Sequence, residues 1–380
     1  MQFVGVAEAL IGIGCFLFIG TKANRSTAWF LATLLAVPLL ISIKHGFVRQ
    51  YIHIINFFCF AALALAFIGA LLPVDGKRSI VTFLVMLNFG IVSLGYVFAP
   101  WDFKQAMAEA TGVRGASLAV DALRFERLRS ALGTKTGHSQ EARVEPEIRA
   151  IIGDSPVASL SLKYSGAVME GLNLRLYPVV QRYSAYTPYL DRWNAAWIRE
   201  QGPRYLFFDG EASDYRHPWA ETPAMWMEVF RWYDTRRLGM RSVLLERRAA
   251  PRFEGLRSIG HETIALSRGM DLPRSQEPVF WKMACGTSAA GTLRKLLFRI
   301  PEVAMEVEGP TGDDKSFRIV LEVLTSPVLG NYLPASLAEF ASVLDPAANL
   351  TPTVRKLTFA GAGVSSYSPI CQVEFLVPAR

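Results

Sequence analysis

Two short polar segments hold the side chains of this chain that are best suited to binding or catalysis. The first, 181–188, precedes an expected helix and carries Gln181, Tyr183, Ser184, Tyr186 and Thr187. Tyrosine rings present a flat amphipathic face on which sugars stack, and a helix N-terminus favours anions. A structural alternative is that Thr187 caps the helix while the tyrosines pack against a sheet with their hydroxyls hydrogen-bonded.

The second polar segment, 209–218, follows an apolar run. Its charged side chains include those of Asp209, Glu211, Asp214 and Arg216. Carboxylates that directly follow a buried strand in the sequence are suited to acid–base catalysis. They can also hold a divalent metal, as the acidic loops of nucleotide-sugar transferases do. An Asp-x-Glu spacing is common by chance, however, and Asp214 can simply pair with Arg216. We therefore predict no metal and no cofactor.

The chain lacks the usual sequence signatures of catalysis. It contains no GxSxG elbow, phosphate-binding loop, GxGxxG motif or HExxH motif. His138, His217 and His261 are far apart in the sequence and have no evident serine or cysteine partner. The sequence therefore assigns no catalytic residue.

Strands and helices alternate around the two polar segments, over residues 156–250. Strands are expected at 157–162, 205–208 and 242–246, and helices start at Thr187-Pro188 and at Thr222-Pro223. The first helix is expected to bury Leu190, Trp193 and Trp197, and the second to bury Trp226, Phe230 and Tyr233 and to end at Gly239. This alternation predicts a small α/β domain with a mostly parallel sheet. In such sheets ligands bind at the carboxyl ends of the strands.

Residues 255–380 are predicted to form a β-sandwich, because short strand-like runs are separated by turn residues. The expected strands are Val279–Ala284, Thr292–Ile300, Val303–Glu308, Phe317–Val323, Lys356–Phe359 and Cys371–Val377, with a helix at Pro334–Val343. Trp281 and Tyr332 are candidates for carbohydrate contact if they are exposed, and packing in the core is the alternative.

The four cysteines fall into two pairs. Cys15 and Cys59 lie in apolar segments and are expected to pack as small residues. Cys285 and Cys371 have no CxxC spacing and no nearby histidine, which argues against a zinc site. They form one disulfide if this region is extracytoplasmic, or stay two separate buried thiols.

Residues 1–100 are almost entirely apolar and are predicted to form a transmembrane bundle of roughly four helices. The candidate spans are Phe3–Gly20, Thr27–Ile43, Ile52–Leu72 and Ile80–Ala99. None carries a charged residue near its middle, which argues against a transporter. Residues 101–155 are expected to form a helical connector, with helices at Leu118–Leu132 and Pro146–Ile152.

Charge says little about orientation or about partners. With the N-terminus outside, equal numbers of basic residues flank the two sides of the bundle, so the positive-inside rule does not orient it. The net charge of +7 is scattered among acidic residues, which argues against nucleic acid as a partner. The expected partners are the lipid bilayer, a glycan or lipid-linked saccharide, and an envelope protein.

The runs VVQRYSAYTPYLDRWNAAWIREQGPRYLFFD and DYRHPWAE resemble a poorly characterised family of bacterial polytopic membrane proteins that are loosely glycosyltransferase-like. The matching residues are Gln181, Tyr183, Ser184, Ala185, Tyr186, Thr187, Asn194, Asp214, Arg216 and Pro218. The resemblance implies a protein of the bacterial inner membrane with an extracytoplasmic C-terminal region. Such proteins usually have more membrane helices, and the acidic first-loop motif of membrane glycosyltransferases is missing from residues 1–100. A catalytic half is therefore expected upstream if the chain is a fragment, and is lacking if the chain is complete.

These observations lead to one main hypothesis and two alternatives. We expect a multi-pass envelope protein whose soluble domains bind a saccharide or lipid-linked glycan during glycan assembly or transfer. The first alternative is a metal-assisted transferase or hydrolase that uses the acidic segment 209–214. The second is a non-catalytic structural subunit of an envelope complex.

Overall fold

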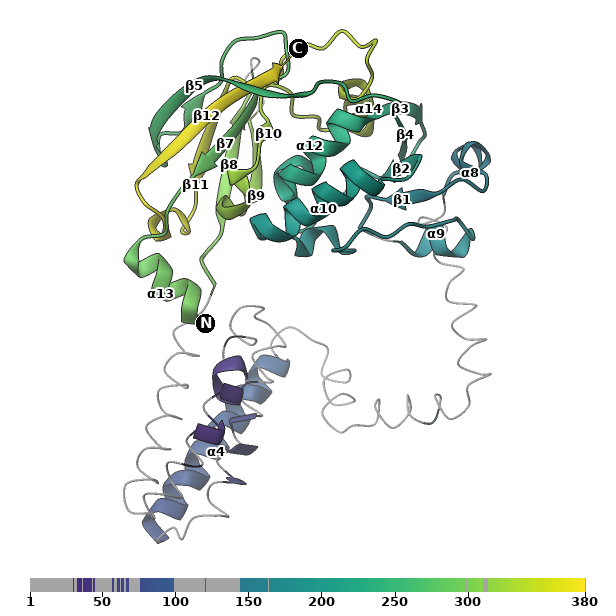
Figure 1. Cartoon of the computed structure of the whole chain (residues 1–380). Helices are drawn as coiled ribbons and strands as arrows, with labels where there is room; N and C mark the ends of the chain where they lie inside the picture. Colours follow the sequence, from purple (N-terminus) through teal and green to yellow (C-terminus); the bar gives the residue numbers. More distant parts are fainter. Residues whose placement is uncertain are drawn as a thin grey trace. The chain divides into compact units, whose positions relative to one another are not determined.

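The computed structural model describes residues 76–98 and 144–379, apart from 163, 298 and 310–313, together with single helical positions between 30 and 67 and at 120 (Figure 1). The chain divides into two compact units. One comprises Met1–Thr134 and Arg294–Arg299, and the other comprises Lys135–Leu293 and Ile300–Arg380. Both polar segments belong to the second unit.

The prediction of a transmembrane bundle is wrong for the part of the chain that the structure describes. No helix found there is long and apolar enough to cross a membrane. The expected span Ile80–Ala99 corresponds to α4 (Gly76–Phe98). This helix takes in Lys77 and Arg78 at its start, and Asn88 interrupts its apolar run.

The remaining predictions for the N-terminal unit fall largely outside the described residues. This applies to the span Phe3–Gly20, and to the connector helix Leu118–Leu132 apart from Val120. Of the spans Thr27–Ile43 and Ile52–Leu72, only scattered helical positions are described.

The second unit begins with an α/β region. Its elements are α8 (Pro146–Ile152), β1 (Val157–Ser159), α9 (Ser165–Met169), α10 (Pro188–Gln201), β2 (Tyr205–Phe208), α11 (Pro218–Glu221), α12 (Pro223–Trp232), β3 (Tyr233–Leu238) and β4 (Val243–Arg247). α8 and β2 have the bounds expected from the sequence. α10 and α12 begin at their Thr-Pro pairs, because the fixed φ angle of proline matches that of the first helical turn.

The sheet of this region is not mostly parallel, which corrects the sequence prediction. Its strand order is β1-β2-β4-β3, and only β1 and β2 pair in parallel. The helix expected to continue to Gly239 ends at Trp232, and the next residues form β3. A connection as short as the one between Leu238 and Val243 makes neighbouring strands antiparallel.

Helices cover both faces of this sheet, as the alternation along β2 shows. Leu206 and Phe208 belong to the apolar cluster that also holds residues of α10 and α12. Tyr205 and Phe207 point to the opposite face, into the cluster built with α8. All four β2 residues are buried. β2 is therefore a buried central strand of the sheet, with β1 beside it at the edge, and the carboxyl end of β2 is held in place.

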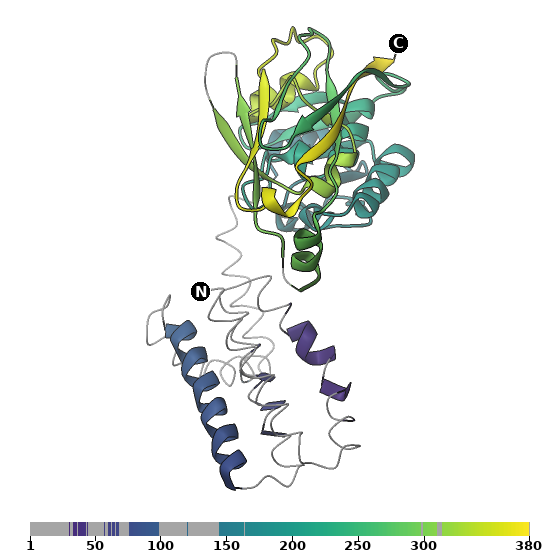
Figure 2. The ribbon, with the colours of Figure 1, turned by 90° about the vertical axis from the view of Figure 1, so that its left-hand side faces the viewer.

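The remainder of the second unit is rich in β-strands. Its elements are β5 (Gly255–Ala265), β6 (Met270–Asp271), β7 (Phe280–Ala284), β8 (Val303–Glu308), β9 (Lys315–Ile319), β10 (Val328–Leu329), α14 (Leu337–Val343), β11 (Lys356–Ala360) and β12 (Ile370–Ala379). The helix α13 (Ala289–Leu297) begins in this unit, and its residues from Arg294 onwards belong to the first unit. The strands form two antiparallel sheets, ordered β10-β7-β12-β5 and β6-β11-β8-β9, that share one apolar core. Figures 1 and 2 show these green-to-yellow strands beside the teal α/β region. The arrangement is compatible with the expected β-sandwich.

Several details of the β-rich region differ from the sequence prediction. The strand expected at Thr292–Ile300 is largely replaced by the helix α13. β5 was not anticipated, because most of its side chains are exposed and it pairs only with β12, so it has no alternating apolar pattern. Trp281 and Tyr332 are buried, which supports packing rather than carbohydrate contact.

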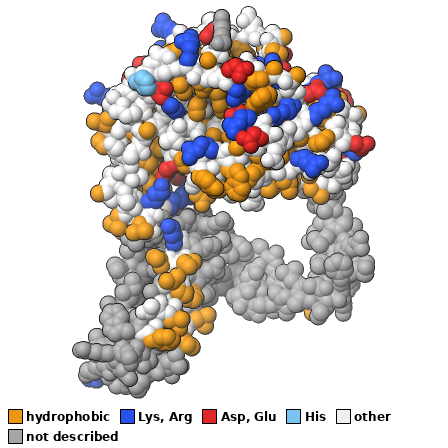
Figure 3. All heavy atoms as spheres, in the orientation of Figure 1, with side chains coloured by type: hydrophobic (Ala, Val, Ile, Leu, Met, Phe, Trp, Pro, Cys, Tyr) orange, Lys and Arg blue, Asp and Glu red, His pale blue; other side chains and the backbone are white. Residues whose placement is uncertain are grey.

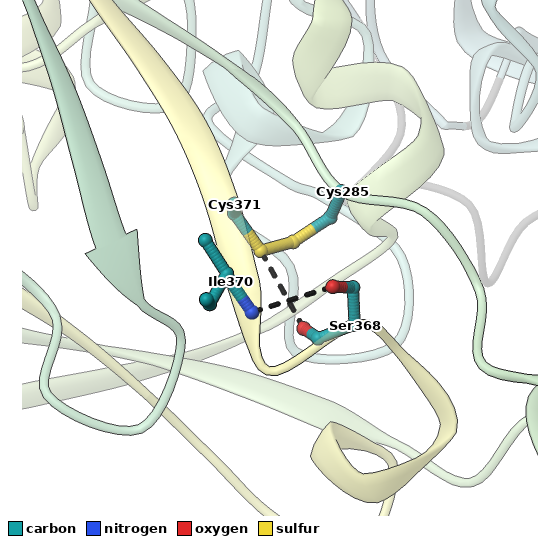
Figure 4. The surroundings of a disulfide bond; sticks show 4 residues. All are labelled: Cys285, Ser368, Ile370 and Cys371. Atoms are coloured by element: carbon teal, nitrogen blue, oxygen red, sulfur yellow. Dashed lines mark hydrogen bonds between the residues drawn. A yellow bond between two sulfur atoms is a disulfide. The ribbon is translucent and has the colours of Figure 1, made fainter.

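Cys285, just after β7, and Cys371, in β12, are joined by a disulfide bond (Figure 4). β7 and β12 are antiparallel neighbours, and Gln372 pairs with Ala284. The two cysteines therefore stand opposite each other, with 4.7 Å between their Cα atoms. Of the two alternatives left open by the sequence, the disulfide is the one present.

Candidate functional site

The two polar segments singled out in the sequence lie against each other. The guanidinium Nη2 of Arg182 donates to the carbonyl oxygen of Glu211 at 2.7 Å, and Nη1 of Arg216 reaches the carbonyl oxygen of Tyr183 at 3.5 Å. The segment 209–218 follows directly on β2, at the carboxyl end of the strand pair β1–β2, which is parallel. The site is therefore where α/β sheets usually bind ligands.

Arg182 is the central side chain of this junction, although it is not among the site residues predicted from the sequence. Its side chain is fully buried, and its Nε lies 3.1 Å from an equally buried oxygen of Glu221. The guanidinium also lies over the rings of Phe208 and Trp226, at 5.5 and 5.8 Å from their centroids. An arginine beside a tyrosine-rich run gave no signal of burial, because arginine is usually exposed.

Asp209 occupies the first position after β2. Its Oδ1 accepts a hydrogen bond from the backbone N–H of Glu211 at 3.1 Å, which fixes the carboxylate against its own loop. Burial raises the pKa of Asp209, while that backbone N–H, the Ser161 hydroxyl and the charge of Arg182 oppose the rise. Ser161 follows β1 closely, so the ends of both parallel strands contribute to this part of the site.

A pair of tyrosine hydroxyls lies in the same neighbourhood. The hydroxyls of Tyr164 and Tyr177 are 2.9 Å apart. Burial raises the pKa of both residues, and the nearby positive charge of Arg182 opposes this. Neither tyrosine is evident as a site residue from the sequence, because neither lies within the two polar segments.

Asp214 anchors its loop through ion pairs. Its carboxylate pairs with Arg216 at 3.4 Å, as the sequence allowed, and with Arg318 of β9 at 2.9 Å. Asp214 and Tyr215 have φ angles of 56° and 59°, which non-glycine residues adopt rarely. The backbone N–H of Arg318 donates to the carbonyl oxygen of Tyr215 at 3.0 Å, which helps to hold this turn.

The acidic side chains do not converge on a metal position. Within the described parts of the chain, no group of three or more His, Cys, Asp or Glu side chains is arranged to hold a metal ion. Asp209 is bound to its own loop, and Asp214 is engaged by two arginines. The residues present therefore give no support to the metal-assisted alternative.

Of the remaining predicted site residues, Thr187 has a structural role. Its hydroxyl accepts from the N–H of Leu190 at 3.3 Å and caps α10. Ser184 lies in a short 3₁₀ turn, Arg182–Ser184, and Gln181 is exposed just before it. Tyr183 is half-buried, whereas Tyr186 is exposed at the start of the helix.

α10 turns a different face to the core from the one predicted. The buried positions are Asp191, Asn194, Ala195 and Ile198, whereas Trp193 is 51% exposed. Two polar side chains fix this orientation. Asp191 accepts from the N–H groups of Ala224 and Met225 at 2.8 and 3.1 Å, at the start of α12. Asn194 bonds both the N–H and the carbonyl oxygen of Val179.

The face of α10 that points away from the core carries exposed aromatic side chains next to the polar segments. They are those of Tyr186, Tyr189 and Trp193, which are 57%, 68% and 51% exposed. The ring centroids of Tyr189 and Trp193 are 6.2 Å apart. In Figure 3, hydrophobic side chains gather over α10 with Lys and Arg side chains around them. We call these three residues the aromatic surface.

In comparisons with known proteins, no family model, no curated protein and no solved structure matches this chain. The resemblance of residues 179–221 to a family of bacterial polytopic membrane proteins therefore stays a prediction.

Proposed function

We propose that the protein binds a saccharide or lipid-linked glycan, with sugar rings stacked on the aromatic surface and polar groups of the two segments hydrogen-bonded to sugar hydroxyls. The observation that carries this proposal is the exposure of Tyr186, Tyr189 and Trp193 beside the carboxyl ends of β1 and β2. Tyrosine and tryptophan combine a large apolar face with a polar edge, which suits a ligand that is itself both apolar and hydroxylated.

The support beneath the aromatic surface favours binding over accidental exposure. Asp191 and Asn194 fasten α10 to α12 and to the segment around Val179 from the side facing away from solvent. The helix that carries Tyr189 and Trp193 is therefore fixed before any ligand arrives. A site whose side chains need little ordering loses less entropy on binding.

The disulfide supports an extracytoplasmic location for the second unit. Cys285 and Cys371 are bonded, and such bonds persist mainly in oxidising compartments. An extracytoplasmic glycan-binding unit would meet the saccharides of the bacterial envelope. We therefore propose the assembly or transfer of envelope glycans as the process in which the protein takes part.

The first test is a panel of envelope saccharides and lipid-linked glycans presented to the full chain. Wild-type protein is expected to bind at least one class. The double variant Tyr183→Ala/Tyr186→Ala is expected to lose that binding, because it removes both tyrosines of the segment 181–188. Met240→Ala, which truncates an exposed side chain at a distant hairpin, is the matched control. Full binding by the double variant would contradict the assignment of this segment.

A further inference from the structure

The exposed face of α10 carries an arginine beside the aromatic surface. Arg192 comes three positions after Tyr189 and directly before Trp193, and all three side chains are exposed. Residues three or four positions apart are neighbours on the surface of a helix, so Arg192 and Trp193 both lie next to Tyr189. A positive charge therefore borders the surface on which sugar rings are proposed to stack.

Arg192 differs from the other arginines of this region, because it has no ionic partner among the described residues. Residues 181–218 contain five arginines. In four of them, a guanidinium nitrogen lies 2.7 to 3.4 Å from a carboxylate oxygen, in the pairs Arg182–Glu221, Arg199–Glu200, Arg204–Glu246 and Arg216–Asp214. The side chain of Arg192 makes neither a hydrogen bond nor an ion pair with the described part of the chain. Its charge is therefore available to a ligand.

The two carboxylates of α10 are engaged elsewhere. Asp191 turns towards the start of α12, where it accepts from two backbone N–H groups at 2.8 and 3.1 Å. Burial raises the pKa of Asp191 to about 7, against the opposing effects of those N–H groups and of the Arg192 charge, so Asp191 is only partly ionised at neutral pH. Glu200, about two turns further along the helix, pairs with Arg199 at 2.7 Å. Neither acid cancels the charge of Arg192.

An uncompensated arginine binds anionic groups best. The planar guanidinium donates two parallel hydrogen bonds to a carboxylate or a phosphate, which a neutral hydroxyl cannot match. Among saccharides, uronic acids carry a carboxylate on the ring, and sugar phosphates carry a phosphate. A neutral saccharide can stack on the same aromatic rings but gains no such pair of hydrogen bonds between opposite charges. The charge beside the stacking rings therefore favours the acidic class.

We propose that the ligand of the aromatic surface is an acidic saccharide whose carboxylate or phosphate is bound by Arg192. This inference rests on the proposed saccharide binding and adds the charge of the ligand to it. The sugar ring stacks on the tyrosine and tryptophan side chains, and the anionic group lies at the edge of the surface, where Arg192 reaches it. Because this pair is exposed to solvent, its contribution to affinity is modest and falls as the salt concentration rises.

The test compares two matched pairs of probes, titrated into the full chain by calorimetry. One pair is trigalacturonate and its neutral trimethyl ester, and the other is glucose 1-phosphate and methyl glucoside. Wild-type protein is expected to bind at least one acidic probe about three to five times more tightly than its neutral counterpart, as suits an exposed ion pair. The pair of probes with the larger ratio of affinities shows whether a carboxylate or a phosphate is preferred.

Three variants assign this preference to Arg192. Arg192→Gln is expected to reduce the ratio of acidic to neutral affinity to about one. Arg192→Lys is expected to keep part of it, because lysine retains the charge but not the planar geometry. Arg257→Gln removes the same charge from an exposed position of β5 and is the control, with the ratio of wild type expected.

The possible failures of this inference and of the proposed function can be told apart. If wild-type protein binds neutral saccharides of the envelope panel but prefers neither acidic probe, this inference alone is overturned. An unchanged ratio in Arg192→Gln, or an equal loss in Arg257→Gln, also overturns it, because the preference then does not come from Arg192. If no saccharide of the panel binds, the proposed function fails and this inference fails with it.

Discussion

Arg182 and Glu221 form an ion pair that is closed to solvent, with 3.1 Å between Nε and Oε2 and 0% exposure of both side chains. Arg182 comes from the segment 181–188, and Glu221 ends α11 after the segment 209–218. The buried pair therefore links the two polar segments to each other. Removing two charges from water costs free energy. We therefore expect the ion pair to hold the two segments together rather than to add to the net stability of the fold.

Breaking this pair on one side is expected to be strongly destabilising. Glu221→Gln leaves the Arg182 guanidinium buried without its counter-charge, which typically costs about 3–5 kcal/mol. The double variant Arg182→Met/Glu221→Leu removes both charges and is expected to cost less than the sum of the two single changes. Urea unfolding of the single and double variants measures this difference. Additive losses would mean that the two charges do not depend on each other.

Asp191 is expected to make the protein less stable as the pH rises. Burial raises its pKa to about 7, against the opposing N–H groups of Ala224 and Met225. The folded state therefore holds a proton that the unfolded state releases from about pH 4. The stability from this group is complete below pH 4 and falls as the pH rises to about 7, by a few kcal/mol.

Asp191→Asn removes this titration while keeping an oxygen that accepts from the start of α12. The free energy of unfolding, measured by urea between pH 4.5 and pH 8, is expected to fall less steeply in the variant than in wild type. Identical slopes would show that Asp191 titrates alike in the folded and unfolded states.

His217 is expected to act in the opposite direction. Burial lowers its pKa to about 4, and its Nε2–H donates to the carbonyl oxygen of Pro334 at 3.0 Å. The ring is thus neutral and held between Phe317 and Phe340. The unfolded state binds a proton below about pH 6.5 and the folded state does not, so this stability is lost as the pH falls from 6.5 towards 4.

His217→Gln is expected to flatten the acid side of the stability profile, because glutamine does not titrate. Since His217 and Asp191 have opposite effects between pH 4 and 6.5, the wild-type profile alone hides both. The difference between each variant and wild type, at each pH, separates them. An unchanged acid slope in the histidine variant would show that its pKa is not lowered by folding.

The disulfide is expected to stabilise the β-rich region. Cys285 and Cys371 are separated by 86 residues, so reduction frees a long loop in the unfolded chain. The loss is expected to be about 2–5 kcal/mol. Protein exported to an oxidising compartment should contain no thiol reactive to Ellman's reagent at these positions after unfolding. Cys285→Ala/Cys371→Ala should unfold at lower denaturant concentration, and an unchanged midpoint would contradict this role.

The parts of the fold that the sequence predicted best are those with strong local signals. The Thr-Pro starts of α10 and α12 are set by proline and by a capping hydroxyl. The run Tyr205–Phe208 is apolar at every position because helices cover both faces of its sheet. Val303–Glu308 alternates between buried and more exposed residues as expected of a sandwich strand.

The failures arose where tertiary contacts override local patterns. Trp193 was assigned to the core of α10 by its hydrophobicity, but Asp191 and Asn194 take the buried face through hydrogen bonds that no sequence period reveals. β3 directly follows α12 and carries Arg and Asp side chains, so it had no strand signal. Both polar segments were identified, but the buried pair of Arg182 and Glu221 that joins them was not.

The most direct test of saccharide binding uses Trp193. The glycan selected from the panel is titrated into wild type, Trp193→Ala, Trp193→Phe and the control Met240→Ala, and affinity is measured by calorimetry. Loss of a stacking ring is expected to weaken binding about tenfold in Trp193→Ala, with partial recovery in Trp193→Phe and none of this loss in the control. Equal affinity of Trp193→Ala and wild type would contradict the claim that the aromatic surface binds the glycan.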